Sequence, residues 1–419
     1  MTTKPLLTIG SPELGGGTDA NVSRREASVW LGAFLVAVYY GNIYVGITLP
    51  AALLLLPFIV CRCPPRIWPP AATWLMVACG ATPIAQWMLG HGPTMRSDFI
   101  EYLPIFYTAL VAWGLSGLVV EPEDVATPLL FGAGLIGVLM VAHMILYPPR
   151  VFAFYLVKAT AATPLGRSNY LAVFLLIALN VALYARASWA RWTAVPLCLA
   201  IGLSLARIGS GFAFLSLLIW LRFVGVERRS VGLVTGGVAV CALPILVVGG
   251  FAARPPSLEN GDSPADIALY YHQESIASLD SISVRGELWT DAVDAFFAFP
   301  LFGVPKSVWS SLGDRFVAGG AHSSILTSLS GRGIWGTFFF GCFIVTALRV
   351  ISRRRSESPV WRGLFVSLIM TFVWSLIEPI VFTPAYACLM TALVGVATTK
   401  NSADACTSRL GEALIRTAA

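Results

Sequence analysis

Long apolar segments separated by short polar stretches repeat along most of the chain. A bilayer-spanning helix takes about 20 apolar residues, and these segments do not alternate every second residue as transmembrane strands do. The pattern predicts helices at residues 28–43, 45–61, 68–90, 99–118, 125–147, 169–186, 191–206, 208–224, 231–251, 324–349, 360–379 and 382–398. We therefore expect an all-α polytopic membrane protein with about 12 transmembrane helices.

Two of the predicted boundaries fall inside continuous apolar runs. Residues 27–61 and 192–221 are low-charge runs of 35 and 30 residues. Each is too long for one helix that rises about 1.5 Å per residue across a bilayer. We place the breaks at residues 41–46 and 207–211, where glycines interrupt the apolar pattern.

The distribution of basic residues favours an even number of crossings with both termini in the cytoplasm. Lys and Arg concentrate in short cytoplasmic loops, and this topology puts eighteen of the 28 basic residues inside and ten outside. Removing one crossing from only one of the two long runs would move either the N-terminal arginines or the Arg353 cluster to the wrong side. The predicted organisation is a cytoplasmic tail (1–27), nine spans (28–251), a long outer loop (252–323), three spans (324–398) and a cytoplasmic tail (399–419).

Composition supports the membrane class. Only 12% of the 419 residues are charged and 57% are hydrophobic, whereas a soluble globular chain carries about 25% charged residues. The mean hydropathy is +0.76. The eight cysteines lie in apolar segments or short basic stretches, so no disulfide framework is expected.

One outer loop, residues 252–323, is much longer than the others. Its 72 residues are rich in Pro, Gly and Asp in the first third and then become periodic. Because long ordered loops are usually functional, we expect the chemistry to lie here, with amphipathic helices forming part of the loop.

Residues 284–299 of this loop predict an amphipathic helix. One face carries the acids Glu287, Asp291 and Asp294, and the other carries Leu288, Trp289, Ala292 and Phe296. Arg285 would project from the middle of the apolar face and would therefore need an anionic partner. That partner is either a buried acid such as Glu378 or a bound ligand.

Arginines collect at the outer ends of the predicted spans. Arg207 is the only charge within residues 192–221, and snorkelling to the membrane surface is the simpler reading of such a residue. The other arginines predicted on the same side favour a ligand-binding role instead; these are Arg150, Arg167, Arg254 and Arg285. Guanidinium groups bind phosphate bidentately and stay charged, which suits a diphosphate headgroup at the membrane surface.

His322 precedes the tenth predicted span, where Ser323 or Ser324 could cap the helix. A helix N-terminus disfavours imidazolium, so a neutral His322 could act as the general base for a hydroxyl nucleophile. An ordinary interfacial histidine is the alternative.

Several absent motifs narrow the chemistry further. The chain has no GxxxxGK[ST] phosphate loop, so ATP hydrolysis by that route is unsupported. Its four dispersed histidines and its cysteines show no paired metal-ligand spacing. We expect no metal and no cofactor.

Three segments carry these candidates in order: LSLARIGSGFAFL around Arg207, SVRGELWTDAVDAFFAFPLFG around Arg285, and AHSSILTSLSGRGIWG around His322. In this order they resemble the O-antigen ligase and polymerase superfamily of bacterial envelope glycosyltransferases. The family pattern is an arginine after a span, then R-x-x-x-W with a later Pro and Gly, then a histidine before a glycine-punctuated span. Ser323 stands where the family often has asparagine.

The resemblance implies transfer of a glycan from an undecaprenyl diphosphate carrier to a sugar hydroxyl. Arg207 and Arg285 would bind the leaving diphosphate, and His322 would deprotonate the acceptor hydroxyl. Trp289 of the R-x-x-x-W motif is a candidate substrate contact. Arg150, Arg167 and Arg254 are added as candidate substrate-binding residues from their side and charge alone.

Within this superfamily, one long outer loop and a short cytoplasmic tail favour the ligase. It would join O-antigen to lipid A-core at the periplasmic face of the bacterial inner membrane, giving lipopolysaccharide, and its partners would be the carrier-linked glycan, the lipid A-core acceptor and membrane lipids. A polymerase is the alternative. A transporter or flippase is a third possibility, although the charges gather at one face and the two halves show no repeat.

Overall fold

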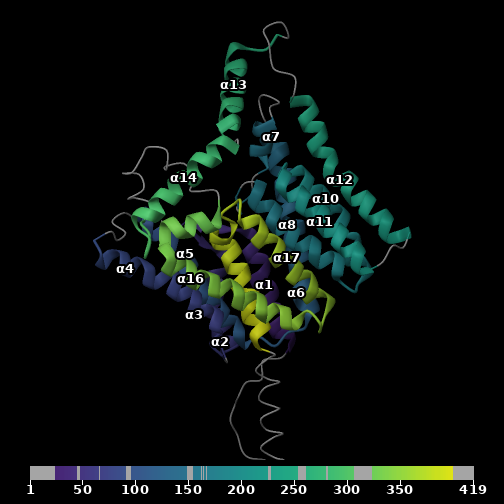
Figure 1. Ribbon diagram of the computed structural model, residues 1–419. Helices are drawn as coiled ribbons and strands as arrows, with labels where there is room; N and C mark the ends of the chain where they lie inside the picture. The colour runs from purple at the N-terminus through teal and green to yellow at the C-terminus, as the bar shows by residue number, and fades with distance from the viewer. Residues whose placement is uncertain are drawn as a thin grey trace, which may run out of the picture.

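The computed structural model of the protein describes residues 24–44, 48–65, 67–90, 96–148, 154–161, 163, 165–166, 168–224, 228–252, 261–279, 282–305 and 323–399. Helices make up almost all of this part of the chain (Figure 1). The expected all-α class is therefore confirmed over the described residues.

Four helices among the described residues are long and apolar enough to cross a membrane. Their spanning parts are Pro122–Leu146 (α6), Arg207–Val224 (α11), Arg229–Val248 within α12 (Arg228–Ala252) and Ser324–Arg354 (α16). Shorter apolar helices are Ala51–Arg62, Leu103–Gly117, Ser168–Tyr184 (α8), Pro359–Ser375 (α17) and Pro384–Thr399. The membrane character is supported, while the number of crossings stays a prediction.

The first long run breaks where glycine was expected to break it. Helix α1 (Arg24–Tyr40) ends before Gly41, whose φ is 110°. An antiparallel hairpin follows, in which β1 (Asn42–Tyr44) pairs with β2 (Thr48–Pro50), with Ile43 opposite Leu49. The chain then continues through η1 (Ala51–Leu55) into α2 (Leu56–Arg62).

The second long run breaks slightly earlier than predicted. Helix α10 (Ala194–Leu203) follows the short α9 (Ser188–Trp192), and α11 begins at Arg207. The Ser204 hydroxyl accepts a hydrogen bond from the Ala206 N–H at 3.3 Å, and Leu205 has a φ of 54°. A serine that binds nearby backbone in this way competes with the helix, so the break lies at residues 204–206.

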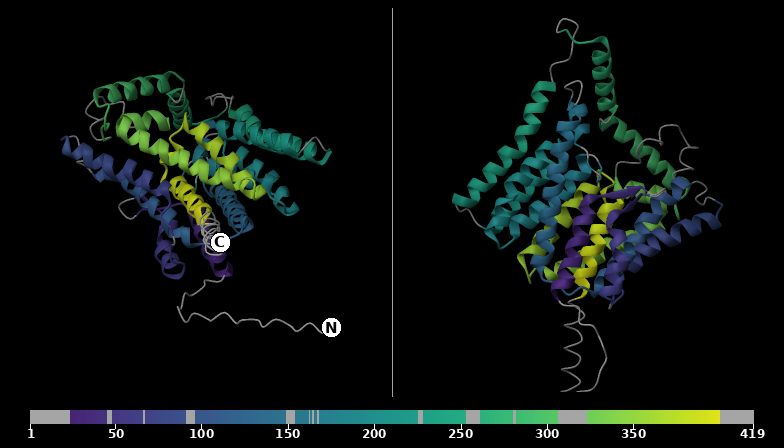
Figure 2. Two further views of the ribbon diagram at one scale, coloured as in Figure 1. Left: turned by 60° about the horizontal axis from the view of Figure 1, so that its bottom comes forward. Right: turned by 180° about the vertical axis from the view of Figure 1, so that it is seen from behind.

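The remaining described elements surround these helices. They are α3 (Pro70–Met76), the π-helical η2 (Val77–Ala81), α4 (Thr82–Met88), α5 (Arg96–Gly114), η3 (Leu115–Gly117), α7 (Phe154–Thr160), α13 (Pro264–Leu279), α14 (Ile282–Ala298) and η6 (Ile380–Phe382). Helices α13 and α14 belong to the predicted long loop, and α13 projects away from the bundle (Figures 1 and 2).

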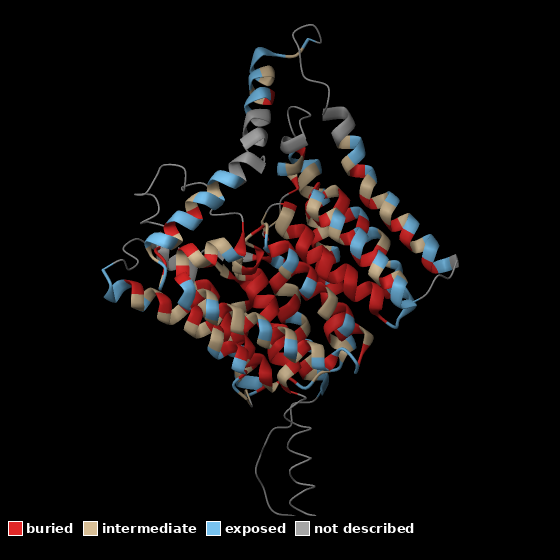
Figure 3. Ribbon diagram, in the orientation of Figure 1, coloured by how far each residue is buried: buried red, intermediate tan, exposed pale blue. Residues whose placement is uncertain are grey.

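Helix α8 lies at the centre of the core (Figure 3). Every side chain from Leu171 to Ala185 is buried, because α6, α10, α11 and α17 pack around it. A helix that is apolar on every face is buried on every face. Gly363 lets α17 approach closely, since a Cβ there would lie 2.6 Å from the Asn180 carbonyl oxygen.

Polar contacts between helices mark two ends of the bundle. At one, the Arg354 end, the Arg24 guanidinium pairs with Glu121, and the Thr399 hydroxyl donates to the Ser116 carbonyl oxygen at 2.7 Å. At the other, the Glu378 end, the contacts join the end of α17 to α8 and α16. Helices that cross a membrane alternately in opposite directions would bring together the same helix ends that meet here.

Arg354 ties the last helix into the bundle. Its side chain is 3% exposed, and its guanidinium donates from Nε to Glu357 Oε2 at 3.1 Å. Nη1 donates to the carbonyl oxygens of Val396 and Ala397, both at 3.4 Å, and the guanidinium carbon lies 4.8 Å from the centre of the Trp361 ring. One cation therefore satisfies the C-terminal carbonyls of Pro384–Thr399.

Arg354→Met should lower the free energy of unfolding by about 3 kcal/mol, because it strips hydrogen bonds from buried carbonyls and from Glu357. Thermal unfolding in detergent measures the loss. The matched control is Arg353→Met, since Arg353 is exposed and should change stability by less than about 0.5 kcal/mol. Equal effects of the two substitutions would contradict the role assigned to Arg354.

Candidate functional site

The end of α17 joins the first turns of two other helices. Glu378 is only 6% exposed, and its Oε1 accepts a hydrogen bond from Asn169 Nδ2, at the start of α8, at 3.2 Å. The Ser324 hydroxyl, at the start of α16, donates to the Glu378 carbonyl oxygen at 3.2 Å. Asn169 and Ser324 lie 209 and 54 positions before Glu378 in the chain and are thereby held in one small volume.

Helix α11 reaches the same place through Trp374. The Glu378 N–H donates to the Trp374 carbonyl oxygen at 3.2 Å, and the Trp374 ring stacks on Phe212 of α11 with centroids 5.6 Å apart. Gly209 allows the approach, since a Cβ there would lie 3.0 Å from the indole ring. We call Asn169, Ser324, Trp374 and Glu378 the Glu378 junction. The first turns of α8, α11 and α16 therefore converge on it.

The convergence of the first turns of α8, α11 and α16 brings three partial positive charges together. Each helix N-terminus carries a partial positive charge and unsatisfied N–H groups, so the region around the Glu378 junction is suited to anions. Arg207, the first residue of α11, is exposed and adds a full positive charge two residues before Gly209. The prediction that Arg207 lies at a helix end is confirmed.

Ser323 caps α16, as one of the two predicted serines. Its hydroxyl accepts a hydrogen bond from the Leu326 N–H at 3.5 Å, and its own φ and ψ are extended. His322 directly precedes this cap in the sequence but lies outside the described residues. The segment around Arg207 and the segment that follows His322 thus meet at the Glu378 junction.

The turn after α14 is hydrogen-bonded to an interruption in α16. The Ile334 N–H donates to the Pro300 carbonyl oxygen at 2.8 Å, and the Trp335 N–H donates to that of Leu301 at 3.0 Å. The interruption is at Gly333, whose φ of 64° and ψ of −168° are not helical. Two of the three segments of the resemblance are therefore bonded to each other.

Gln86 of α4 fastens this contact from the other side. It is 1% exposed, and its Nε2 donates to the carbonyl oxygens of Phe302 and Gly331 at 2.7 and 2.8 Å. Carbonyls released by the break in α16 and by the turn are in this way satisfied inside the protein.

Two glycines make the close approach possible. Gly303 and Gly333 both have a φ of 64°, a region that favours glycine. A Cβ on Gly303 would lie 2.5 Å from the Arg332 nitrogen, and one on Gly333 would lie 2.4 Å from the Leu301 carbonyl oxygen. The Pro and Gly that follow the R-x-x-x-W motif therefore dock on the glycines of the next segment.

Arg332 is a charged residue of this region that we did not expect. It is 4% exposed, its guanidinium carbon lies 4.3 Å from the centre of the Phe382 ring, and its side chain hydrogen-bonds with Cys79. It stabilises the break between the two parts of α16 by joining η2 to η6. The available signal was a charge inside a predicted span, which is functional or structurally essential by default.

Helix α14 packs through only part of the predicted apolar face, since Ala292 is buried as predicted but Trp289 is not. Its buried side chains are Ala292 and Ala295, which pack with Val304, Phe299 and Leu326, because alanines allow α14 to approach α16 closely. Trp289 is 37% exposed and is accessible to a ligand instead of lying in the apolar interior.

The polar face of α14 agrees with the prediction, since Glu287 and Asp294 are exposed. Arg285 lies in the first half of α14, and its side chain falls outside the described residues, as do Arg150, Arg167 and Arg254 entirely. The proposed pairing of Arg285 with Glu378 stays a prediction.

No group of three or more His, Cys, Asp or Glu side chains suited to a metal ion occurs among the described residues. The expectation of metal-independent chemistry stays a prediction.

A comparison with protein-family models finds no match for this chain, and a search among curated proteins likewise finds none.

Gly333→Ala should lower the free energy of unfolding by about 2 kcal/mol or more, because alanine disfavours a positive φ and its Cβ would collide with backbone. Thermal unfolding in detergent again measures this. Gly341→Ala on the same helix is the control, since a Cβ there meets no atom within 4 Å. If the two variants unfolded at the same temperature, the close docking at Gly333 would be refuted.

Proposed function

We propose that the protein is a membrane glycosyltransferase of the O-antigen ligase type. It would move O-antigen polysaccharide from undecaprenyl diphosphate to the lipid A-core acceptor, at the periplasmic face of the bacterial inner membrane. The observation that carries the proposal is the convergence of three helix N-termini and Arg207 at the Glu378 junction. Such a site favours a multiply charged anion such as a diphosphate.

A groove beside the break in α16 fits the lipid part of such a donor. Its volume is about 690 Å³, and its lining is mostly apolar, from Leu329 and Ile334 near the break to Val345 and Arg349 farther along. Ile334 and Val345, which both follow the break, are about 17 Å apart along the helix, which is more than half of the roughly 30 Å hydrocarbon thickness. A polyprenyl chain lying there would have its diphosphate near the break.

The chemistry then divides among a few side chains. His322 takes the proton of the acceptor hydroxyl as the oxygen attacks the anomeric carbon. The bond between that carbon and the diphosphate oxygen breaks, and the carrier diphosphate leaves with the electron pair. Arg207 and Arg285 stabilise its growing negative charge, and exposed Trp289 offers an aromatic face to a sugar ring.

A transporter or flippase is the second candidate, and the interrupted α16 favours it. Broken helices and buried charges such as Arg332 mark substrate paths in transporters. The polymerase of the same superfamily would use the same site with a growing glycan as acceptor.

Alanine variants at Arg207, Arg285 and His322 should each lose long-chain lipopolysaccharide and accumulate carrier-linked glycan in cells. Loss of one charge-stabilising group should lower the rate about 10²- to 10³-fold, and loss of the base about 10²- to 10⁴-fold. Arg222→Ala is the matched control for Arg207, because it is exposed at the other end of α11. His272→Ala is the matched control for His322, because His272 is exposed on α13.

A reconstitution experiment distinguishes the ligase, the polymerase and the transporter. Purified protein is mixed in detergent with carrier-linked O-antigen and lipid A-core, with a chelator and without ATP. Product formation supports the ligase, and chain elongation without core identifies the polymerase. Absence of any product, with normal lipopolysaccharide ladders in all three variants, would refute an enzyme with this site.

The predicted orientation can be tested with Cys61. Among the described cysteines Cys61 is exposed, whereas Cys342 is half-buried and the others are buried. Burial and the nearby Glu26 raise the pKa of the Cys63 thiol, which lowers its reactivity because the thiolate is the nucleophile. In a Cys406→Ser background, an impermeant maleimide should label inverted vesicles and leave intact spheroplasts unlabelled.

Cys61→Ser in the same background is the control and should remove the signal from the vesicles. Cys61 lies near the Arg354 end, because a Cβ on Gly117, next to Ser116, would lie 2.8 Å from the Cys63 carbonyl oxygen. Labelling of intact spheroplasts would therefore place the Arg354 end outside the cell and would reverse the proposed orientation.

A further inference from the structure

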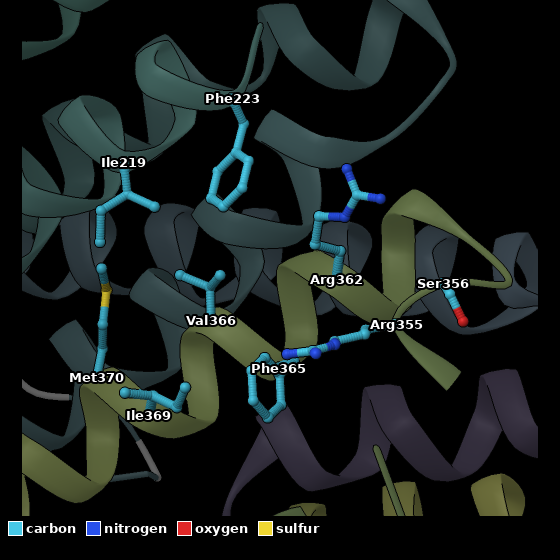
Figure 4. Close-up of a pocket in the computed structure, with 9 residues that line it drawn as sticks. All are labelled: Ile219, Phe223, Arg355, Ser356, Arg362, Phe365, Val366, Ile369 and Met370. Atoms are coloured by element: carbon cyan, nitrogen blue, oxygen red, sulfur yellow. The ribbon is translucent and has the colours of Figure 1, made fainter. Parts of the chain in front are cut away.

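A lateral groove opens between the last turns of α11 and the part of α17 from Arg362 to Met370, next to the Arg354 end of the bundle (Figure 4). Its volume is about 620 Å³. Arg355 and Arg362 line one end of the groove, and the aliphatic side chains of Ile219, Ile369 and Met370 line the other (Figure 4). The groove is therefore charged at one end and apolar at the other.

Contacts with α8 hold the two walls in place. Tyr184 of α8 packs edge-to-face on Phe223 of α11, with centroids 6.3 Å apart. The Ser216 hydroxyl of α11 donates to Met370 Sδ of α17 at 3.0 Å and closes the apolar end. At the charged end, the Arg355 guanidinium carbon lies 5.3 Å from the centre of the Phe365 ring, so the arginine is held over the groove.

The charge of this end is not balanced by acids of the described chain. Ion pairs at the Arg354 end join Arg24 to Glu121 and Arg354 to Glu357. Among the described residues, no acidic side chain pairs with Arg355 or Arg362. Two guanidinium groups beside a groove at a membrane surface attract phosphate, which they can bind bidentately.

The length of the apolar wall matches one leaflet. Arg362 and Met370 are about 12 Å apart along α17, within half of the roughly 30 Å hydrocarbon core. A soluble anion would leave this wall exposed, and a zwitterionic lipid would bring its own cation to the arginines. The ligand that complements both ends is an anionic phospholipid.

We propose that this groove binds an anionic phospholipid from the leaflet at the Arg354 end. Its phosphate lies between Arg355 and Arg362, and one acyl chain lies against Ile219, Val366 and Ile369. This site is separate from the Glu378 junction and does not depend on the proposed glycosyltransferase activity.

Native mass spectrometry of the full-length protein, titrated with phosphatidylglycerol or phosphatidylcholine, tests the proposal. Wild type should prefer phosphatidylglycerol, and the double variant R355Q/R362Q should lose roughly thirtyfold in affinity for it, about fivefold per arginine. The control R229Q/R353Q removes the same charge from two exposed arginines outside the groove and should keep wild-type affinity.

A third variant tests the apolar wall. Val366→Trp should fill the groove and lower phosphatidylglycerol affinity by about tenfold or more, while both arginines remain, and millimolar inorganic phosphate should not compete with the lipid. An equal loss in R229Q/R353Q, equal affinities for the two lipids, or unchanged binding in Val366→Trp would each overturn the proposal.

Discussion

A buried carboxylate at the end of α17 is the interaction on which the candidate site depends. A carboxylate removed from water is costly unless hydrogen bonds satisfy it, and Glu378 receives one from Asn169 at the start of α8. Its backbone carbonyl receives another from Ser324 at the start of α16. Because these bonds must form for the acid to stay buried, helix starts that are distant in the sequence are held at one place.

The break in α16 is the second constraint, and it depends on glycine. Backbone groups released within a membrane must find partners inside the protein, and here the turn from Pro300 to Gly303 and the side chain of Gln86 supply them. Only residues without a Cβ allow two backbones to approach so closely. The turn that follows α14 is thereby fixed relative to the cap of α16.

The two ends of the bundle use arginine in different ways. Arg354 is buried and satisfied by carbonyls and by Glu357, so it serves the fold. Arg207, Arg355 and Arg362 are exposed, and guanidinium groups at a membrane surface attract anionic lipid groups. In this chain, of which only 12% of the residues are charged, the arginines at these helix ends therefore either close the structure, as Arg354 does, or stay exposed and bind a lipid phosphate in our proposals.

The hydrophobic pattern was enough to predict the helical class, the break at residues 41–46 and the helix of α14, because apolar length and local backbone preference act over short stretches of chain. It placed the second break at residues 207–211, a few residues after the observed one at 204–206. It also predicted a serine cap on α16. It did not predict the Glu378 junction, the docking of Gly303 on Arg332, the burial of Arg332, or that α14 would bury Ala295 and leave Trp289 exposed. These depend on contacts between residues tens to hundreds of positions apart, which periodicity does not encode and which only close packing of the helices decides.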